Sequence, residues 1–289
     1  MISTRKKNYI VEYLPTTIRA ARLSSRVSPL SVEAILEVER GEDESANKEI
    51  RRFAGVKSNG FLNGKCSVYP ANRIIRKLRV DSPKGREADF VLDFIRREEN
   101  VNPNDLKAYC LSAGNGCDRE LEECNKQDIL VCGALKTEIE EIQKDLLGNG
   151  IFPQTLEIGS VGIIGVIMDM MTWANLTEPL MFLEIERDFT TAIILGPSGV
   201  EVTRRIEFGS SNIATALKEE MNLKDEAAAA KLLSSKDFDF GSMAHNLLRK
   251  LLRELQSTIG FFEVQTGQTV SSVFCLRREG RLDWLENSV

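Results

Sequence analysis

Short runs in which apolar and polar residues alternate occur twice along the chain. Three such runs open the sequence, at residues 8–13, 17–24 and 30–39. Three more follow the midpoint, at 181–186, 190–195 and 200–208. Turn-forming residues such as Pro15 and the stretch 196–199 separate the runs, which is typical of β-meanders. Two meanders, each followed by helical periodicity, predict an α/β fold with an internal duplication.

The expected helices share apolar residues spaced three and four positions apart. They cover 84–99, 134–147, 159–173, 211–221, 225–233 and 241–262. The segment 159–173 has the character of a buried helix. An extended run at 67–80 mixes basic with apolar residues, and a last strand is expected at 270–276. Segment 83–157 runs through helix, strand, strand and helix, so we predict a compact α+β insertion there.

The composition is that of an ordinary soluble globular protein. The chain has 289 residues, of which 42% are hydrophobic and 28% charged, and its net charge is −5. A nucleic-acid-binding domain of this size is usually basic, so we expect no nucleic-acid partner. The sequence shows neither the apolar core of a signal peptide nor an uninterrupted run of about 20 apolar residues. We therefore expect a cytoplasmic protein.

Six cysteines and a single histidine limit the chemistry that the chain can perform. His245 lies in a helical stretch and is expected to be exposed, and any Ser-His-Asp or Cys-His chemistry would have to use it. The cysteines are expected to be free thiols packed as small apolar groups. An alternative is a metal site built from neighbouring cysteines, namely Cys110, Cys117, Cys124 and Cys132. No histidine lies nearby to complete it, so no metal is expected.

Segments 129–134, 150–158, 203–210 and 252–262, by their order and spacing, resemble the PilM-type proteins of type IV pilus assembly. These are relatives of the cell-division actin FtsA and of the cytoplasmic half of the secretion protein GspL. The resemblance implies an actin-like (ribonuclease H-like) duplicated α/β fold with an inserted α+β subdomain. The expected segments are 1–82 (first actin-like subdomain), 83–157 (insertion), 158–208 (second lobe), 209–262 (helical subdomain) and 263–289 (return to the second lobe).

Members of this superfamily hold nucleotide phosphates with two β-hairpins, each carrying Asp-x-Gly followed by small hydroxyl residues. Glycine lets the backbone N–H groups approach the phosphates. By resemblance the first hairpin falls on residues 11–19. Glu12 replaces the aspartate and Leu14 replaces the glycine, while Thr16 and Thr17 keep the hydroxyl positions. The following proline also removes one N–H donor.

The second hairpin falls, by the same resemblance, on residues 183–191. Glu184 stands at the aspartate position, Glu186 at the glycine position and Thr190 at a hydroxyl position. A carboxylate at the glycine position puts negative charge beside a polyphosphate. The turn at Gly209 still resembles its counterpart.

The nucleoside side of the site is altered as well. Lys231 remains from the ribose-binding helix motif, but Ala228 replaces its glutamate, and Arg277 and Arg278 replace glycines of the adenine loop. A charge-assisted hydrogen bond contributes about 1.5–3 kcal/mol, so losing three or four costs roughly 5–10 kcal/mol. Because about 1.4 kcal/mol is tenfold in affinity, micromolar ATP binding would be lost. We therefore expect a pseudo-ATPase, not an enzyme, with no ATP or magnesium cofactor.

The resemblance implies that the chain is a scaffold bound to the cytoplasmic tail of a PilN-type inner-membrane protein. The tail is expected in a groove between the first subdomain and the insertion. Basic residues of the extended run border this junction and are candidates to bind an acidic peptide or the anionic membrane surface. They are Arg73, Arg76, Lys77 and Arg79. The alternative is that they are the solvated face of an edge strand.

Two other functions remain open at this point. One is an ATP-binding actin-like switch with an unconventional site, which would use ATP and Mg²⁺ or bind another anion through Arg277 or Arg278. The other is an interaction module or filament-forming protein outside secretion. A pilus or secretion assembly ATPase is a further candidate partner. In the scaffold interpretation the chain lies in the cytoplasm at the inner face of the inner membrane, held there by its partners.

Overall fold

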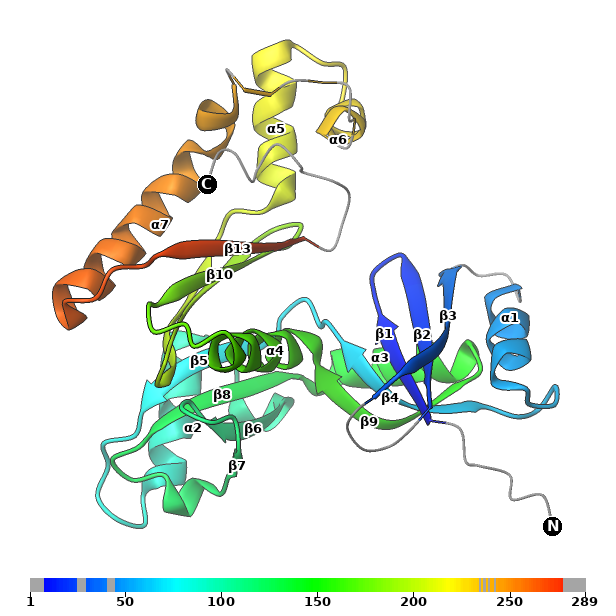
Figure 1. Cartoon of the computed structure of the whole chain (residues 1–289), viewed down its shortest axis with the longest axis horizontal. Coiled ribbons are helices and arrows are strands. Elements are labelled where there is room, and N and C mark those ends of the chain that lie inside the picture. Colours follow the sequence, from blue (N-terminus) through cyan, green and yellow to red (C-terminus); the bar gives the residue numbers. More distant parts are fainter. Residues whose placement is uncertain are drawn as a thin grey trace.

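Three β-sheets form the framework of the protein (Figure 1). The computed structural model describes residues 8–24, 30–40, 45–233, 235, 238, 240–241 and 243–277. Two of the sheets start with a three-strand antiparallel meander, which confirms the predicted duplication. The third sheet comes from the chain between them.

The first sheet is built on the N-terminal meander. Its strands are β1 (Asn8–Tyr13), β2 (Thr17–Leu23), β3 (Val32–Glu39), β4 (Leu62–Val68) and β9 (Ile151–Ile158), in the order β3-β2-β1-β4-β9. Alternation places Val11, Ile18 and Leu62 on one face, where they are fully buried. The helices that cover this face are α1 (Ser45–Ala54) and α3 (Lys136–Gly148). We call this unit the first lobe.

The second sheet repeats the plan. Its strands are β10 (Leu180–Ile185), β11 (Thr190–Gly196), β12 (Gly199–Ile206) and β13 (Ser272–Arg277), in the order β12-β11-β10-β13. Phe182 faces α4 (Gly159–Trp173), whereas Leu183 faces α7 (Ala244–Thr266) on the other side. Both central strands are buried along their whole length, because helices cover both faces. We call this unit, with α4, the second lobe.

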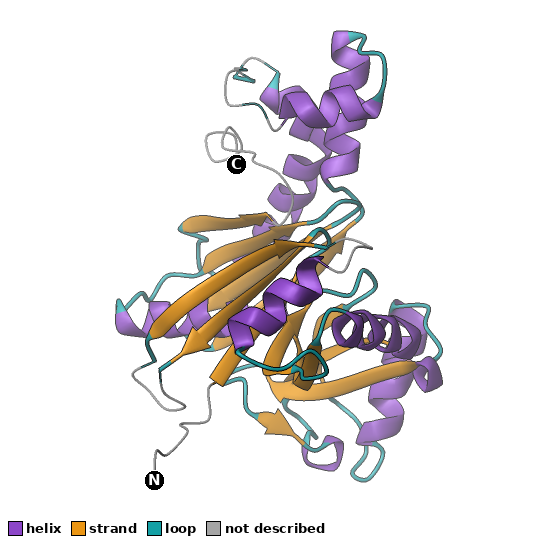
Figure 2. Ribbon diagram, turned by 90° about the vertical axis from the view of Figure 1, so that its right-hand side faces the viewer, coloured by secondary structure: helices purple, strands orange, loops and turns teal. Residues whose placement is uncertain are grey.

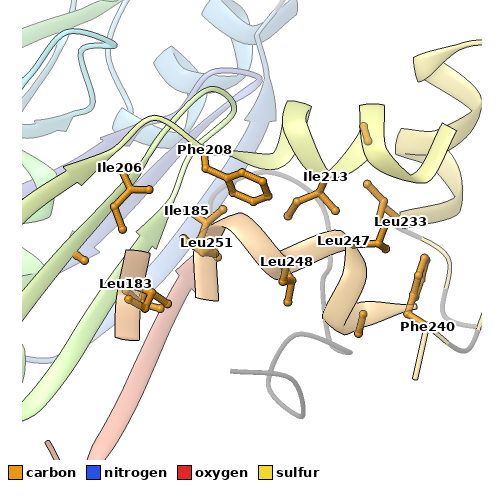
Figure 3. Packing of buried hydrophobic residues seen from close by; sticks show 14 of the residues in the cluster. Leu183, Ile185, Ile206, Phe208, Ile213, Leu233, Phe240, Leu247, Leu248 and Leu251 are labelled. Atoms are coloured by element: carbon orange, nitrogen blue, oxygen red, sulfur yellow. The ribbon is translucent and has the colours of Figure 1, made fainter. Parts of the chain in front are cut away.

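A helical segment extends the second lobe beyond the edge of its sheet (Figure 2). It consists of α5 (Ser210–Met221), α6 (Glu226–Leu233) and the first half of α7. Figure 3 shows how Phe208 and Ile213 meet Leu247 and Leu251 of α7, so that the helical core is continuous with the core of the sheet. None of the described helices has the length and the apolar character needed to cross a membrane.

The third sheet belongs to the insertion. Its strands are β5 (Ile74–Arg79), β6 (Leu106–Ser112), β7 (Asp118–Arg119) and β8 (Asp128–Leu135), in the order β5-β8-β6-β7. Its other elements are α2 (Glu87–Glu98) and the 3-10 turns η1 (Pro103–Asp105) and η2 (Leu121–Glu123). Ile129 packs towards α2, and Leu130 packs towards α4 of the second lobe. The insertion therefore sits directly against the second lobe.

The third sheet and the core of the first lobe do not divide the chain at the boundaries predicted for the insertion, 83–157. The extended run 67–80 is two strands in two different sheets, so the insertion sheet already begins at β5. At the other end, Leu146 of α3 and Ile151 of β9 belong to the core of the first lobe. The helix at 159–173 has the predicted bounds but is only half-buried, since Val166 and Trp173 are exposed. Its outward face carries Asp169 as well as these two apolar residues, so the high apolar content of the segment did not mean burial on all sides.

Candidate functional site

The tip of the first hairpin, between β1 and β2, is closed by the protein's own groups. The Leu14 N–H donates to the Thr17 carbonyl oxygen at 2.9 Å, and the Leu14 side chain is buried. Arg40 Nη1 donates to the carbonyl oxygens of Leu14 at 2.9 Å and Pro15 at 2.7 Å. The Arg40 N–H donates to the Thr16 carbonyl oxygen at 2.8 Å. The Leu14 N–H and the carbonyl oxygens at the tip of the hairpin are therefore already engaged inside the first lobe.

An arginine from the first half of the chain reaches the second hairpin. Arg73 Nη2 donates to Glu184 Oε2 at 2.7 Å and also to Glu186 Oε1. The side chains of Arg73 and Glu184 are 2% and 1% exposed, and that of Glu186 is 12% exposed. Both carboxylates that replace the expected Asp and Gly are thus paired with one guanidinium, away from water.

Two further groups hold this ion pair. Arg73 Nε donates to Ser160 Oγ at 3.0 Å, and the Ser160 hydroxyl lies 2.7 Å from Glu184 Oε2. Arg73 Nη1 donates to the Pro70 carbonyl oxygen at 3.1 Å. The guanidinium fork therefore uses all three nitrogens, as planar arginine permits and lysine does not. We call Arg73, Ser160, Glu184 and Glu186 the Arg73 cluster; it joins the turn after β4 to α4 and to the second lobe.

The start of α5 faces the tip of the second hairpin and is also closed. The Ser210 and Ser211 N–H groups donate to the carbonyl oxygens of Glu186 and Arg187, each at 2.8 Å. A Cβ added at Gly209 would lie 2.4 Å from the Arg187 carbonyl oxygen, so only glycine fits this approach. Free N–H groups at a helix N-terminus are a usual anion site. Here two of these N–H groups, those of Ser210 and Ser211, already donate to carbonyl oxygens of the second hairpin.

The other predicted nucleotide positions are spread over the second lobe. Thr190 is buried, and its hydroxyl donates to the Phe208 carbonyl oxygen at 2.7 Å. Lys231 is exposed on α6, in the helical segment. Arg277 is the last residue of β13, and Arg278 lies outside the described residues. Thus Glu184, Glu186 and Gly209 come together at the second hairpin.

A tyrosine links the first hairpin to the start of α4. Tyr69 donates its hydroxyl to Glu12 Oε1 at 3.1 Å, and Arg19 lies 3.5 Å from the other oxygen of Glu12. The Tyr69 ring also rests against Gly159, where an added Cβ would be only 2.1 Å from it. Because Gly159 precedes Ser160, the path from Glu12 to the Arg73 cluster is made of directly packed groups.

The prediction that Arg73 belongs to an open basic surface was wrong, because its side chain is buried in the cluster just described. The other three basic residues of the run have acidic partners on the protein. Arg76 lies 2.5 Å from Glu99, Lys77 3.3 Å from Glu201, and Arg79 3.2 Å from Asp128. Only Arg79 is largely exposed. The charge of this run is therefore largely balanced within the molecule, and no strong positive patch results.

A pocket of about 440 Å³ lies beside the tip of the first hairpin. It is lined by the hairpin and Arg40, by the turn after β4 and by α3: Tyr13, Leu14, Pro15, Arg40, Tyr69, Pro70, Ala71, Glu138, Glu141, Ile142 and Asp145. Arg40 stacks on the Tyr13 ring, with its Cζ 4.1 Å from the ring centre, and lies 3.1 Å from Asp145. Tyr13 donates to Asp145, and burial raises the pKa of this phenol well above its ordinary value. These contacts hold the side chains of Tyr13, Arg40 and Asp145 in one arrangement at the pocket.

The charge of the pocket is negative. Of its ionisable side chains, Arg40 is the only cation, and it already pairs with Asp145. Glu138 accepts a hydrogen bond from Asn72 Nδ2 at 2.8 Å through Oε1. Its Oε2 is buried with no hydrogen-bond partner among the described residues, and the same holds for Arg40 Nε in the same lining. The carboxylates of the lining still outnumber its one cation. With Glu141 beside it, this carboxylate is suited to a cationic group.

Comparison with known proteins shows the fold but no close relative. No protein-family model and no curated protein matches the sequence. A chain from the solved PilM–PilN type IV pilus biogenesis complex matches 98% of this chain and 86% of its own length, at 15% identity and a TM-score of 0.66. A Bacteroides thetaiotaomicron protein of actin-like ATPase fold and unknown function matches 99% of this chain and 98% of its own length, at 10% identity and a TM-score of 0.44. The first match confirms the expected PilM-type, actin-like fold.

Sequence reasoning missed the residues that organise the site. Arg73 was assigned to the surface because its carboxylate partner lies 111 positions away. Tyr69 and Ser160 do not belong to any motif that the sequence analysis used. The signal that was available is the pair Glu184 and Glu186 in an otherwise apolar strand region. Buried carboxylates need a cationic partner, so an unassigned arginine could have been sought.

Proposed function

We propose that this chain is an actin-like scaffold protein of a type IV pilus or type II secretion assembly that works without bound nucleotide. In this proposal it binds the cytoplasmic tail of a PilN-type membrane protein. The observation that carries the proposal is the Arg73 cluster, which satisfies the second phosphate hairpin internally. The fold match to a chain of a PilM–PilN complex supports the choice of a pilus-type assembly in this proposal.

The argument against nucleotide binding rests on electrostatics and on backbone geometry. Glu186 places a carboxylate where the resemblance expects a glycine, close to the position of a phosphate. At 4 Å and an effective dielectric constant near 20, two unit charges of the same sign repel by about 4 kcal/mol. A polyphosphate at this hairpin would meet that repulsion and would find the hairpin and α5 amides occupied. A repulsion of about 4 kcal/mol lowers affinity roughly a thousandfold, so binding that would be micromolar becomes millimolar.

The partner site in this proposal is the 440 Å³ pocket beside the first hairpin. Its apolar and aromatic lining suits a short peptide, and the unpaired Glu138 oxygen suits a lysine or arginine side chain of that peptide. The tail would therefore be basic, not acidic as the basic run suggested. Because the tail of such a partner is cytoplasmic, the chain would act at the inner face of the inner membrane. An assembly ATPase remains a further proposed partner.

The nucleotide part of the proposal is tested by isothermal titration of the purified protein with ATP and Mg²⁺. We expect no heat of binding up to millimolar ATP. A dissociation constant in the micromolar range would overturn the pseudo-ATPase proposal and favour the ATP-dependent switch.

The partner part is tested by capturing a PilN-type membrane protein, through its tagged cytoplasmic tail, from the native cell. Glu141→Lys reverses one charge of the pocket and should weaken capture at least tenfold. Glu140→Lys is the matched control, because Glu140 is exposed on the same helix but does not line the pocket. Double charge reversal at Arg76 and Arg79 tests the basic run. If that variant loses capture and Glu141→Lys does not, the tail binds at the basic run.

A further inference from the structure

The turn after β4, residues 69–73, belongs to two sites at once. On one side Tyr69, Pro70 and Ala71 line the pocket next to the first hairpin. On the other side Arg73 enters the buried cluster with Ser160 and Glu184. Only a single residue, Asn72, separates the pocket wall from the ion pair.

Arg73 itself keeps the turn closed. Its N–H donates to the Pro70 carbonyl oxygen at 3.2 Å, and its guanidinium Nη1 donates to the same oxygen at 3.1 Å. The bond from Nη1 to the Pro70 oxygen can form only while the guanidinium lies in the buried cluster, next to Glu184. The position of the Pro70 carbonyl, and with it the pocket wall, therefore depends on an ion pair made with the second lobe.

The remaining bonds of the turn lead into the same pocket. Asn72 donates its side-chain amide to Glu138 Oε1 at 2.8 Å and its N–H to the same oxygen at 3.3 Å. These bonds orient the carboxylate whose other oxygen is unpartnered. Tyr69 is held by Glu12 on one side and by Gly159 on the other. A change at the Arg73 cluster would thus move the wall, the carboxylate and the tyrosine together.

We propose that the Arg73 cluster is the positioning element of the pocket, so that the contact between the lobes and occupation of the pocket stabilise each other. Arg73 makes no contact with the ligand in this proposal; it acts through Pro70 and Asn72. The proposal rests on the proposed function for the identity of the ligand only. Linkage is reciprocal, and coupling between two sites is commonly 5- to 150-fold in affinity.

The first measurement does not need a ligand. Amide hydrogen exchange of the full chain is followed by mass spectrometry in peptides covering 69–73 and α3. Arg73→Met should speed exchange in both regions by about tenfold, because the ion pair no longer holds the turn. Arg76→Met is the matched control: it removes an ion pair with Glu99 from the adjacent strand without touching the turn. It should leave both regions as in the wild type.

The second measurement uses a fluorescein-labelled synthetic peptide of the PilN-type tail. Arg73→Met should weaken its binding about tenfold, whereas Arg204→Met, which removes an ion pair with Glu254 in the second lobe, should not. If Arg73→Met does not fold, Ser160→Ala replaces it, since this variant removes only the hydroxyl between Arg73 and Glu184. For Ser160→Ala the expected effects have the same direction and are smaller.

The outcomes separate the two proposals. If the wild type binds no tail peptide, the proposed function fails, while the exchange data still decide whether the cluster positions the pocket. If a folded Arg73→Met or Ser160→Ala protein exchanges at 69–73 as the wild type does, the positioning role is refuted. It is equally refuted if the variants lose peptide binding no more than Arg204→Met.

Discussion

Replacing Arg73 by methionine tests the buried ion cluster most directly. Methionine keeps much of the side-chain volume but removes the guanidinium that pairs with Glu184, whose side chain is 1% exposed, and with Glu186. Removing one partner of a buried ion pair costs about 3–5 kcal/mol, because the remaining charge is buried and uncompensated. The bond from Arg73 Nε to Ser160 adds about 1 kcal/mol. We therefore expect a loss of about 4–6 kcal/mol in the free energy of unfolding.

The assay is thermal unfolding at neutral pH, with urea unfolding as the second measurement. At about 2–4 °C per kcal/mol for a domain of 150–250 residues, the expected fall in melting temperature is roughly 10–20 °C. Arg76→Met should cost only about 1 kcal/mol, since that pair is partly exposed. The double variant Arg73→Met/Glu184→Gln should recover at least about 2 kcal/mol, because it removes the stranded charge.

Two results would refute this reasoning. One is an Arg73→Met protein whose stability falls by no more than that of Arg76→Met. The other is strict additivity in the double variant, because additivity would mean that Arg73 and Glu184 do not interact. Either result would remove the Arg73 cluster from the argument about the nucleotide site.

Three further predictions follow from the packing of single groups. Gly159→Ala should cost about 1–3 kcal/mol in thermal unfolding, because its Cβ would meet the Tyr69 ring, whereas Gly162→Ala on the same helix meets nothing and should stabilise by up to about 1 kcal/mol. A thiol reagent should modify two cysteines quickly in the native protein and four more only after denaturation. The two exposed thiols are Cys117 and Cys275. Burial raises the pKa of the Cys66 thiol from 9.0 to about 12, so the thiol loses its proton less readily in the folded state than in the unfolded state. The free energy of unfolding should therefore be unchanged below pH 9 and fall between about pH 9 and 12. Cys66→Ala should flatten that part of the pH profile of thermal unfolding.

The parts of the fold that the sequence predicted well are those decided by local pattern. The helix at 159–173 and the strand at 8–13 have the predicted bounds. Both follow from periodicity and from turn residues that act within a few positions. The predicted start of the insertion differs from the start of the third sheet because 67–80 reads as one extended segment, whereas a turn within it sends its two halves to different sheets. Pro70 and Asn72 are the residues that mark this turn in the sequence.

The sequence indicates which positions of the candidate site differ from the family pattern, but not which contacts their side chains make. Leu14 and Glu186 stand where the resemblance expects glycine, and the loss of nucleotide binding stays a prediction. The pairing of Glu186 with Arg73 is a contact across 113 positions and depends on how the two lobes meet. The same limit explains the basic run: four cations in sequence suggest a positive surface, but each finds a carboxylate only after folding.

The position of the Arg73 cluster has a consequence for how such a protein would be controlled. A ligand that binds between two lobes stabilises their contact by an amount that depends on its concentration. A guanidinium built into the chain supplies the same kind of contact at a fixed strength, whatever the nucleotide level. If the lobes are joined in this way, ATP would bind no arrangement of the two lobes more tightly than another. A ligand with equal affinity for both arrangements does not change their populations. Control must then come from groups that share the turn at 69–73, and in the described part of the chain these lead to the pocket on the first lobe.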